Sequence, residues 1–159
     1  VFCENNDLRD MEIIGVEVPL EARLYTENKE PSDYVLAGVL DLIVCTESGQ
    51  PIIVDFKTAS KAMAQSAADD DNQMTAYSYL LAAEGYVESK AEVQCRFDVL
   101  RKLKTPKYEK VETARTTFHR RRFAKLANAV LTAISQGIFL PQPSWMCGDC
   151  PYDDVCKSW

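Results

Sequence analysis

Two aspartates and one lysine interrupt stretches of the sequence that are otherwise apolar. Asp41 lies inside one such run, and Asp55-Phe56-Lys57 closes the next. A charge in a buried strand is costly unless it is paired or bound to a metal. Asp41, Asp55 and the carbonyl oxygen of Phe56 would offer hard oxygen ligands to a divalent cation such as Mg²⁺. Lys57 beside that ion could activate a water molecule or stabilise charge on a phosphate. The alternative is that these residues form a buried Asp–Lys ion pair.

A second pair of polar residues, Gln73 and Tyr77, stands four residues apart on a predicted helix. Residues at this spacing share one helix face. The amide and the phenol could hold a phosphate there or support the lysine. Ordinary amphipathic spacing would produce the same pattern.

The six cysteines are unevenly distributed along the chain. Three form a C-x2-C-x5-C pattern near the C-terminus, and the others lie far apart: Cys147, Cys150 and Cys156, against Cys3, Cys45 and Cys95. Thiolates crowded in this way are typical of a zinc or iron–sulfur ligand set. The alternatives are a disulfide with one free thiol, or inert thiols. Reduced thiols would indicate an intracellular compartment.

Basic residues are concentrated in one segment, although the net charge of the chain is −6. Ten of the 18 Lys and Arg residues lie between residues 101 and 125, where only two acidic residues oppose them. The local field, and not the net charge, attracts a polyanion. The candidate DNA contacts in this segment are Arg120, Arg121, Arg122 and Lys125. The alternative is that these side chains line the solvated faces of a hairpin and a helix.

Length and composition limit the class of protein. The chain has 159 residues, of which 47% are hydrophobic and 26% charged, the balance of a globular domain. No uncharged apolar run reaches the roughly 18 residues that a membrane span needs. No signal peptide is visible. These observations exclude the membrane, coiled-coil, collagen-like and disordered classes, and we expect a cytoplasmic protein.

Hydrophobic periodicity predicts the elements that must position the polar residues. Strands are expected at 16–24, 35–45, 52–57 and 93–99, with a hairpin through 105–111. Helices are expected at about 72–84 and at 123–134, each ended by a glycine. The run 35–45 is almost continuously apolar, which is typical of a central strand covered on both faces. We therefore predict an α/β fold with a mixed central sheet flanked by helices, followed by an irregular cysteine-rich tail.

The motifs occur in one order along the chain. Gly38-x-x-Asp41 is followed by Asp55-Phe56-Lys57 after an Ile-Ile-Val strand, then by Gln73-x-x-x-Tyr77 and by the C-terminal cysteines. This order resembles the PD-(D/E)XK nuclease superfamily, and within it the RecB-like branch, which includes AddB and CRISPR-associated adaptation nucleases with a C-terminal cysteine cluster. The resemblance covers nearly the whole chain. It implies a restriction-endonuclease-like core at residues 1–140 and a cluster-binding tail at 141–159.

The resemblance also implies a role for each residue of the core motifs. Asp41 and Asp55 would bind Mg²⁺ or Mn²⁺. Lys57 would be the catalytic lysine. Gln73 and Tyr77 would support the site and contact DNA.

In the tail, the resemblance implies a [4Fe–4S] cluster bound by Cys147, Cys150 and Cys156, with Zn²⁺ as the alternative metal and Cys3 as a candidate fourth ligand. The RecB-like branch usually carries a metal-binding histidine before the G-x-x-D strand, whereas the one histidine here is His119, far downstream. This difference fits a chain that lacks its N-terminal helices.

Glu17 is a third acidic candidate for the metal site, because related nucleases often carry a glutamate in the strand before G-x-x-D. It shares its strand face with Glu21 and Arg23. That arrangement favours a solvated or structural role for Glu17.

The expected function is a metal-dependent DNA nuclease that hydrolyses phosphodiester bonds with a metal-activated water, as an exonuclease on single-stranded DNA or DNA ends. The resemblance implies a recombination, repair, phage or CRISPR-adaptation system, with helicase, recombination or CRISPR proteins as partners. Two alternatives are a DNA-binding module of the same fold with weak or no turnover, and a zinc-stapled interaction domain.

Overall fold

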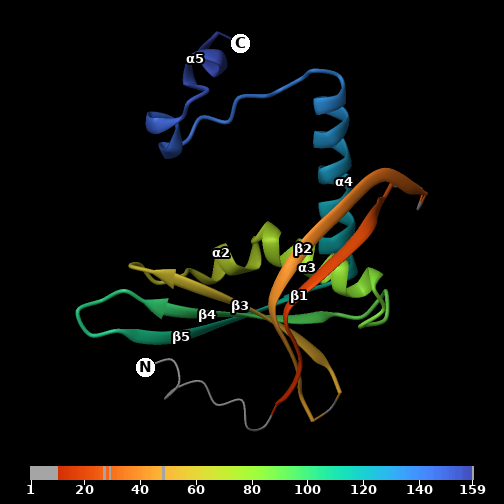
Figure 1. Ribbon diagram of the computed structural model, residues 1–159, viewed down its shortest axis with the longest axis vertical. Helices are drawn as coiled ribbons and strands as arrows, with labels where there is room; N and C mark the ends of the chain where they lie inside the picture. Colours follow the sequence, from red (N-terminus) through yellow and green to blue (C-terminus); the bar gives the residue numbers. More distant parts are fainter. Residues whose placement is uncertain (1–10, 27, 29, 48, 159) are drawn as a thin grey trace. The chain divides into compact units, whose positions relative to one another are not determined.

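The computed structural model describes residues 11–26, 28, 30–47 and 49–158 of the chain. Its strands are β1 (Glu12–Tyr25), β2 (Pro31–Cys45), β3 (Pro51–Ala59), β4 (Val93–Arg101) and β5 (Lys107–Arg115). Its helices are α2 (Gln65–Asp69), α3 (Asn72–Ala83), α4 (Thr117–Ser135) and α5 (Asp153–Lys157), with a 3₁₀ helix η1 (Trp145–Asp149). Figure 1 shows these elements along the chain.

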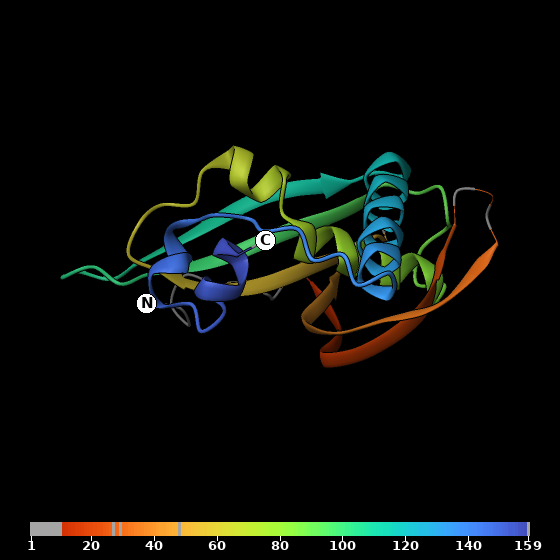
Figure 2. The same ribbon diagram turned by 90° about the horizontal axis from the view of Figure 1, so that it is seen from above.

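The five strands form one mixed sheet in the order β1-β2-β3-β4-β5. Neighbouring strands are antiparallel except β3 and β4, which are parallel. A parallel pair needs a crossover connection, and α2 and α3 supply it. Both helices lie on the same face of the sheet (Figures 1 and 2). The expected mixed α/β sheet with flanking helices is confirmed.

The main hydrophobic core lies between this face of the sheet and α3. Phe97 and Val99 of β4 pack with Met74 and Leu80 of α3, and all four are fully buried. A smaller cluster of Leu42, Val44 and Val54 occupies the opposite face, as the alternation of side chains along a strand requires. The core therefore fixes α3 against this face of the sheet, where it contacts β1, β2 and β3.

The boundaries of α3 follow from its two end residues. Asp71 precedes the helix and its Oδ1 accepts a hydrogen bond from the Met74 N–H at 2.7 Å, which satisfies an otherwise unpaired donor of the first turn. Gly85 follows the helix with φ +80°, a conformation that glycine adopts without strain. The helix predicted at about 72–84 is thus confirmed.

The strand expected at 35–45 is covered on both faces only near its end. β2 pairs with β3 from Leu42 to Cys45 alone. Before that point β2 runs beside β1 as a two-stranded ribbon, in which Val35 and Val39 are 57% and 46% exposed. The prediction was wrong for this half of β2. Apolar residues also occupy the part of the strand that pairs with β1 alone, where one face is open to solvent.

Three other elements differ from the predictions. The short helix α2 was not expected, α4 begins at Thr117 and not near Phe123, and the tail contains the helices η1 and α5. Each is a short or terminal stretch in which apolar periodicity is weak. The N-termini of α2 and α5 also lack a side-chain cap, so the sequence carries no local signal for these two helices.

The chain divides into two compact units inside α4, after Asn128. This division falls before the boundary expected after residue 140. The first unit contains the sheet, α2, α3 and the start of α4. The second contains the rest of α4, η1 and α5. In the part of the chain that the structure describes, none of the helices has the length and hydrophobicity of a membrane span.

Candidate active site

The two aspartates meet where β2 and β3 separate. The ladder between these strands ends with the pair Leu42–Val54, and its register would place Asp41 opposite Asp55. In place of a backbone bond, the Asp41 carboxylate accepts a hydrogen bond from the Phe56 N–H, with Oδ2 2.9 Å from the nitrogen. A side chain therefore ends the ladder, and both carboxylates lie at the same point of the sheet.

Asp55 is the buried member of the pair, with 1% of its surface exposed. Burial raises the pKa of its carboxyl group, the ion pair with Lys57 opposes that shift, and the negative charges of Asp41 and Asp71 add to it. The Lys57 Nζ lies 2.8 Å from Asp55 Oδ2. This ammonium group is the positive charge that makes a buried carboxylate tolerable.

Lys57 continues into a chain of hydrogen bonds that reaches α3. Its Nζ donates to Gln73 Oε1 at 2.7 Å, and Gln73 Nε2 donates to the Tyr77 hydroxyl at 2.8 Å. Gln73 and Tyr77 lie one turn apart on α3, so one helix face supplies both groups. The Lys57 ammonium is thereby held between a strand carboxylate and a helix amide.

Gly38 explains how α3 approaches β2 so closely. A Cβ atom at this position would lie 3.2 Å from both Tyr77 Cε1 and Leu80 Cδ1. A Cβ atom here would require the Tyr77 ring or Leu80 to give way by a few tenths of an ångström, and glycine avoids this. The Gly38-x-x-Asp41 pattern thus joins a packing position to a site carboxylate on one strand.

Arg115 is a residue of the site region that no sequence motif singles out. Its side chain is completely buried. Its guanidinium donates to the carbonyl oxygens of Ala68 and Asp71, at 2.6 and 3.2 Å, and to Thr75 Oγ1 at 2.8 Å. These contacts fix the corner between α2 and α3, from which Gln73 projects. A lone arginine at a strand end gives no sequence signal for such a role.

The two carboxylates would supply part of the ligand set that a divalent cation needs. Asp55 Oδ2 is buried and, apart from its ion-pair contact with Lys57, has no hydrogen-bond partner, so part of its capacity as a ligand is unused. Asp41, Asp55 and the Phe56 carbonyl would supply hard oxygen donors. Among the described residues, however, no group of three or more His, Cys, Asp or Glu side chains is placed to hold a metal. The remaining ligands would be water and substrate oxygens.

Glu17, the third acidic candidate, lies on the edge strand β1 at the level of Asp41. Its neighbours Val16 and Val18 pair with Leu42 and Leu40, and Glu17 itself is exposed with φ +50°. It does not complete a three-residue ligand group with the aspartates.

The C-terminal cysteines are not assembled as a ligand set in the described part of the chain. Cys147 Sγ accepts a hydrogen bond from the Ser144 N–H at 3.2 Å, so this sulfur belongs to the cap of η1. Cys156 lies on α5. The structure therefore does not support the expected [4Fe–4S] or Zn²⁺ centre. Cys3 lies outside the described residues.

The four basic residues expected to contact DNA differ in exposure. Arg121, Arg122 and Lys125 are exposed on α4. Arg120 is 5% exposed, and its guanidinium donates to the Ala91 carbonyl at 2.7 Å and to Ser78 Oγ at 3.1 Å. Arg120 thus ties α4 to α3 and to the loop before β4. A buried and fully engaged guanidinium is not available to a phosphate, which corrects the expectation for this residue.

Comparisons with known proteins bear on the fold and the family. No curated protein matches the sequence. Among solved structures, the chain is similar to SSO0001, with 16% sequence identity and a TM-score of 0.52 over 91% of this chain. The chain spans 60% of the SSO0001 chain. At this identity the likeness shows the fold alone.

A family model covers almost all of the sequence. The model of the PD-(D/E)XK nuclease superfamily matches residues 3–157. The matched range includes the site residues that the structure brings together on β2, β3 and α3. The chain therefore belongs to the PD-(D/E)XK nuclease superfamily.

Proposed function

We propose that this protein is a metal-dependent DNA nuclease that hydrolyses phosphodiester bonds at the cluster of Asp41, Asp55 and Lys57. The observation that carries the proposal is the position of the Lys57 Nζ, held between Asp55 Oδ2 and Gln73 Oε1 at 2.8 and 2.7 Å. An ammonium group fixed beside a buried carboxylate, with a second carboxylate on the neighbouring strand, is suited to phosphate chemistry. We further propose single-stranded DNA or DNA ends as substrate and exonuclease action.

Each residue of the cluster has a defined task in this proposal. A divalent cation, when bound, supplies Lewis-acid polarisation of the phosphate and lowers the pKa of a water ligand. Asp41 and Asp55 are the residues that would hold it. Lys57 places a positive charge where negative charge develops on the phosphate oxygens. Gln73, itself held by Tyr77, restricts the ammonium to one position.

Positive charge on the β4–β5 hairpin favours a polyanionic substrate. Its turn lies next to the end of β3, because Ala59 pairs with Arg101 and its carbonyl accepts from the Lys102 N–H at 2.8 Å. The exposed lysines of this turn are Lys102, Lys104 and Lys107. They bring positive charge to the end of the strand that carries Lys57, where a nucleic-acid backbone would enter.

A DNA-binding module without turnover is the second candidate. The observation that favours it is that the described residues offer two carboxylates to a cation, with no third acidic or histidine ligand grouped with them. Such a module would keep DNA affinity and show no metal-dependent cleavage. The cysteine centre is not part of either proposal, because the sulfur positions do not support it.

The test compares Lys57→Ala with Lys61→Ala on labelled single-stranded DNA in the presence of Mn²⁺. Lys61 is exposed in the loop after β3, so its substitution removes the same charge outside the hydrogen-bonded cluster. We expect Lys57→Ala to lower the cleavage rate by roughly 100-fold or more, with Lys61→Ala close to the parent. Thermal unfolding confirms that both variants are folded.

Two results would speak against the proposal. A folded Lys57→Ala protein that cuts as fast as the parent would remove Lys57 from catalysis. A parent protein that binds the DNA but does not cleave it with Mg²⁺ or Mn²⁺ would favour the binding module.

A further inference from the structure

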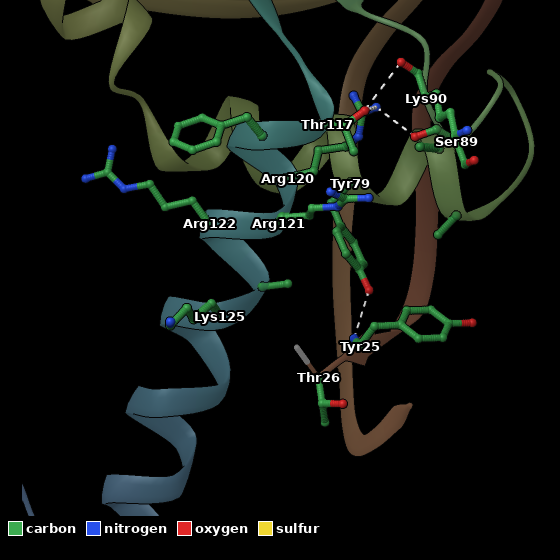
Figure 3. A pocket seen from close by; sticks show the side chains of 14 residues that line it. Tyr25, Thr26, Tyr79, Ser89, Lys90, Thr117, Arg120, Arg121, Arg122 and Lys125 are labelled. Carbon is green, nitrogen blue, oxygen red and sulfur yellow. Dashed lines mark hydrogen bonds between the residues drawn. The ribbon is translucent and has the colours of Figure 1, made fainter. Parts of the chain in front are cut away.

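A pocket of about 790 Å³ lies in the first unit, away from the carboxylate cluster. It is formed by the end of β1, the second half of α3, the loop before β4 and the first turns of α4 (Figure 3). Its lining includes Tyr25, Tyr79, Lys90, Phe118 and Arg121. A volume of this size is within the range of ligand sites, roughly 300–1,000 Å³.

The walls of the pocket are held by hydrogen bonds. The Tyr79 hydroxyl donates to the Arg23 carbonyl at 2.7 Å and accepts from the Tyr25 N–H at 3.1 Å. Asn128 Nδ2 donates to the Tyr25 carbonyl at 3.1 Å. The end of β1 is therefore tied to both α3 and α4.

Arg120 fixes the opposite wall. Its guanidinium donates to the carbonyls of Ser89 and Ala91, at 3.1 and 2.7 Å, on both sides of Lys90. The exposed Lys90 side chain is thus presented by an anchored backbone. Figure 3 shows Arg121 extending from α4 toward Tyr79.

The charge of the lining is of one sign. Among the described residues that line the pocket, the ionisable side chains other than tyrosine are all basic: Lys90, Arg120, Arg121, Arg122 and Lys125. Exposed aromatic rings stand beside these charges, since Tyr25 is 48% and Phe118 68% exposed. Cations beside accessible aromatic rings are the combination that binds single-stranded nucleic acid, in which phosphates meet the charges and bases stack on the rings.

We propose that this pocket is a binding site for a single-stranded nucleic-acid segment. Lys90 and Arg121 contact its phosphates, and a base stacks on Phe118 or Tyr25. The role rests on the proposed nuclease function, because it assigns a second contact to the same substrate. The complementary charge favours this occupant over an apolar peptide.

The pocket is separate from the cluster of Asp41, Asp55 and Lys57. Tyr77 faces the cluster, and Tyr79, two residues later, is rotated from it by about 200° around the α3 axis. Gln73 and Tyr79 are also about 9 Å apart along that axis. A small phosphodiester bound at the cluster does not reach the pocket, whereas a DNA strand has the length to contact both.

The binding test uses fluorescence anisotropy with a labelled oligothymidylate and the Lys57→Ala protein as background, so that cleavage does not interfere. The variant is Lys90→Gln with Arg121→Gln. The matched control is Arg23→Gln with Lys61→Gln, which removes the same charge from positions outside the pocket. We expect the pocket variant to bind roughly tenfold more weakly and its log–log salt slope to fall by about 1.4, or about 0.7 for each phosphate that is no longer neutralised.

A second arm tests stacking. Phe118→Ala should weaken oligothymidylate binding roughly tenfold and leave the salt slope unchanged, because a ring carries no counterion. Equal binding by the pocket variant and its control would overturn the proposal. Equal losses for oligothymidylate and inorganic polyphosphate, with no effect of Phe118→Ala, would overturn the nucleic-acid assignment in favour of a general anion site.

Hydrolysis of bis(4-nitrophenyl) phosphate separates this proposal from the proposed function. In an otherwise unchanged protein, the pocket variant should hydrolyse this small diester as the parent does, and Lys57→Ala should not. A loss of hydrolysis in the folded pocket variant would contradict a role limited to binding. An inactive parent that still shows the pocket-dependent affinity would contradict the nuclease proposal alone.

Discussion

The burial and pKa of an ionisable residue in this protein depend on the strands and helices that pack around it. Asp55 is buried by the sheet and α3, and burial raises the pKa of its carboxyl group. Lys57, with 34% of its side chain exposed, supplies the compensating charge from two residues along the same strand. The pair is therefore both a stability cost and the centre of the proposed chemistry, a combination typical of functional sites.

Asp69 offers a test at the residue scale. Hydrogen bonds from Gln65 and Thr113 to its Oδ1, at 2.9 and 2.8 Å, lower the pKa of its carboxyl group in the folded state. Because the folded pKa lies below the unfolded one, the stabilisation is present above the ordinary carboxyl pKa and is lost as pH falls through the folded value. We predict that Asp69→Asn lowers the free energy of unfolding at neutral pH and that its difference from the parent shrinks in acid. Urea denaturation at the two pH values measures this, and a difference that is constant with pH would contradict it.

Among the elements, α3 contributes residues both to the carboxylate cluster and to the pocket. Its first turns provide Gln73 and Tyr77, and its later turns line the pocket. Its position depends on close contact with β2 at Gly38 and on the buried Arg115 at its start. A small displacement of this helix would change the position of the Lys57 ammonium.

Gly38→Ala tests that dependence. The added Cβ would lie 3.2 Å from Tyr77 and Leu80, which are too well buried to move away easily. We predict a loss of about 1–3 kcal/mol in the free energy of unfolding, together with reduced cleavage. Gly148→Ala is the control, since a Cβ there meets nothing within 4 Å. Denaturant titration of both variants provides the measurement, and a Gly38→Ala protein of parental stability would show that α3 can shift freely.

The strands, the helix α3 and the site motifs could be predicted from the sequence because each has a local signal. Apolar periodicity marks the elements, and Asp41 and Lys57 are evident as charges within apolar runs. The register of β2 and β3, which places the two aspartates together, follows from a short turn. These features depend on residues close in sequence.

Features that depend on distant residues could not be predicted. Arg96 and Asp98 alternate with core residues, which indicates an exposed face, yet they form a buried ion pair with contacts of 2.7 and 3.0 Å. The burial of Arg120 and Arg115 is likewise decided by carbonyl oxygens in other elements. The sequence does not indicate which carbonyl a long side chain will reach. Buried and exposed basic residues therefore cannot be distinguished before the fold is known.

At the scale of the whole molecule, the basic segment 101–125 does not form one surface. β5 runs antiparallel to β4, so that Lys107 pairs with Arg101 and Arg115 with Val93. The lysines of the turn and the basic start of α4 therefore lie at opposite ends of a strand roughly 25–30 Å long. One group lies at the end of the strand that carries Lys57 and the other lines the pocket, so an extended strand of nucleic acid could contact both.

Thiol reactivity reports the integrity of the first unit as a whole. Cys95 lies in the main core, and burial raises the pKa of its thiol to about 12. Because the thiolate is the reactive form, we predict that iodoacetamide at neutral pH labels the exposed Cys156 rapidly and labels Cys95 only on global unfolding. Mass spectrometry with and without urea measures both rates. Labelling of native Cys95 as fast as Cys156 would mean that the core opens without unfolding.

The contacts of Arg115 also have a consequence for synthesis of the chain. Every residue of the proposed catalytic cluster has been translated once Tyr77 is in place, yet the corner that orients α3 is tied down by a side chain from the end of β5. At about 5–20 residues per second, a ribosome adds Arg115 roughly 2–8 s after Tyr77. A nascent chain that already carries all the catalytic groups would lack the tie that sets their geometry. Competence to cut DNA would then arise late, only after the whole sheet has been made.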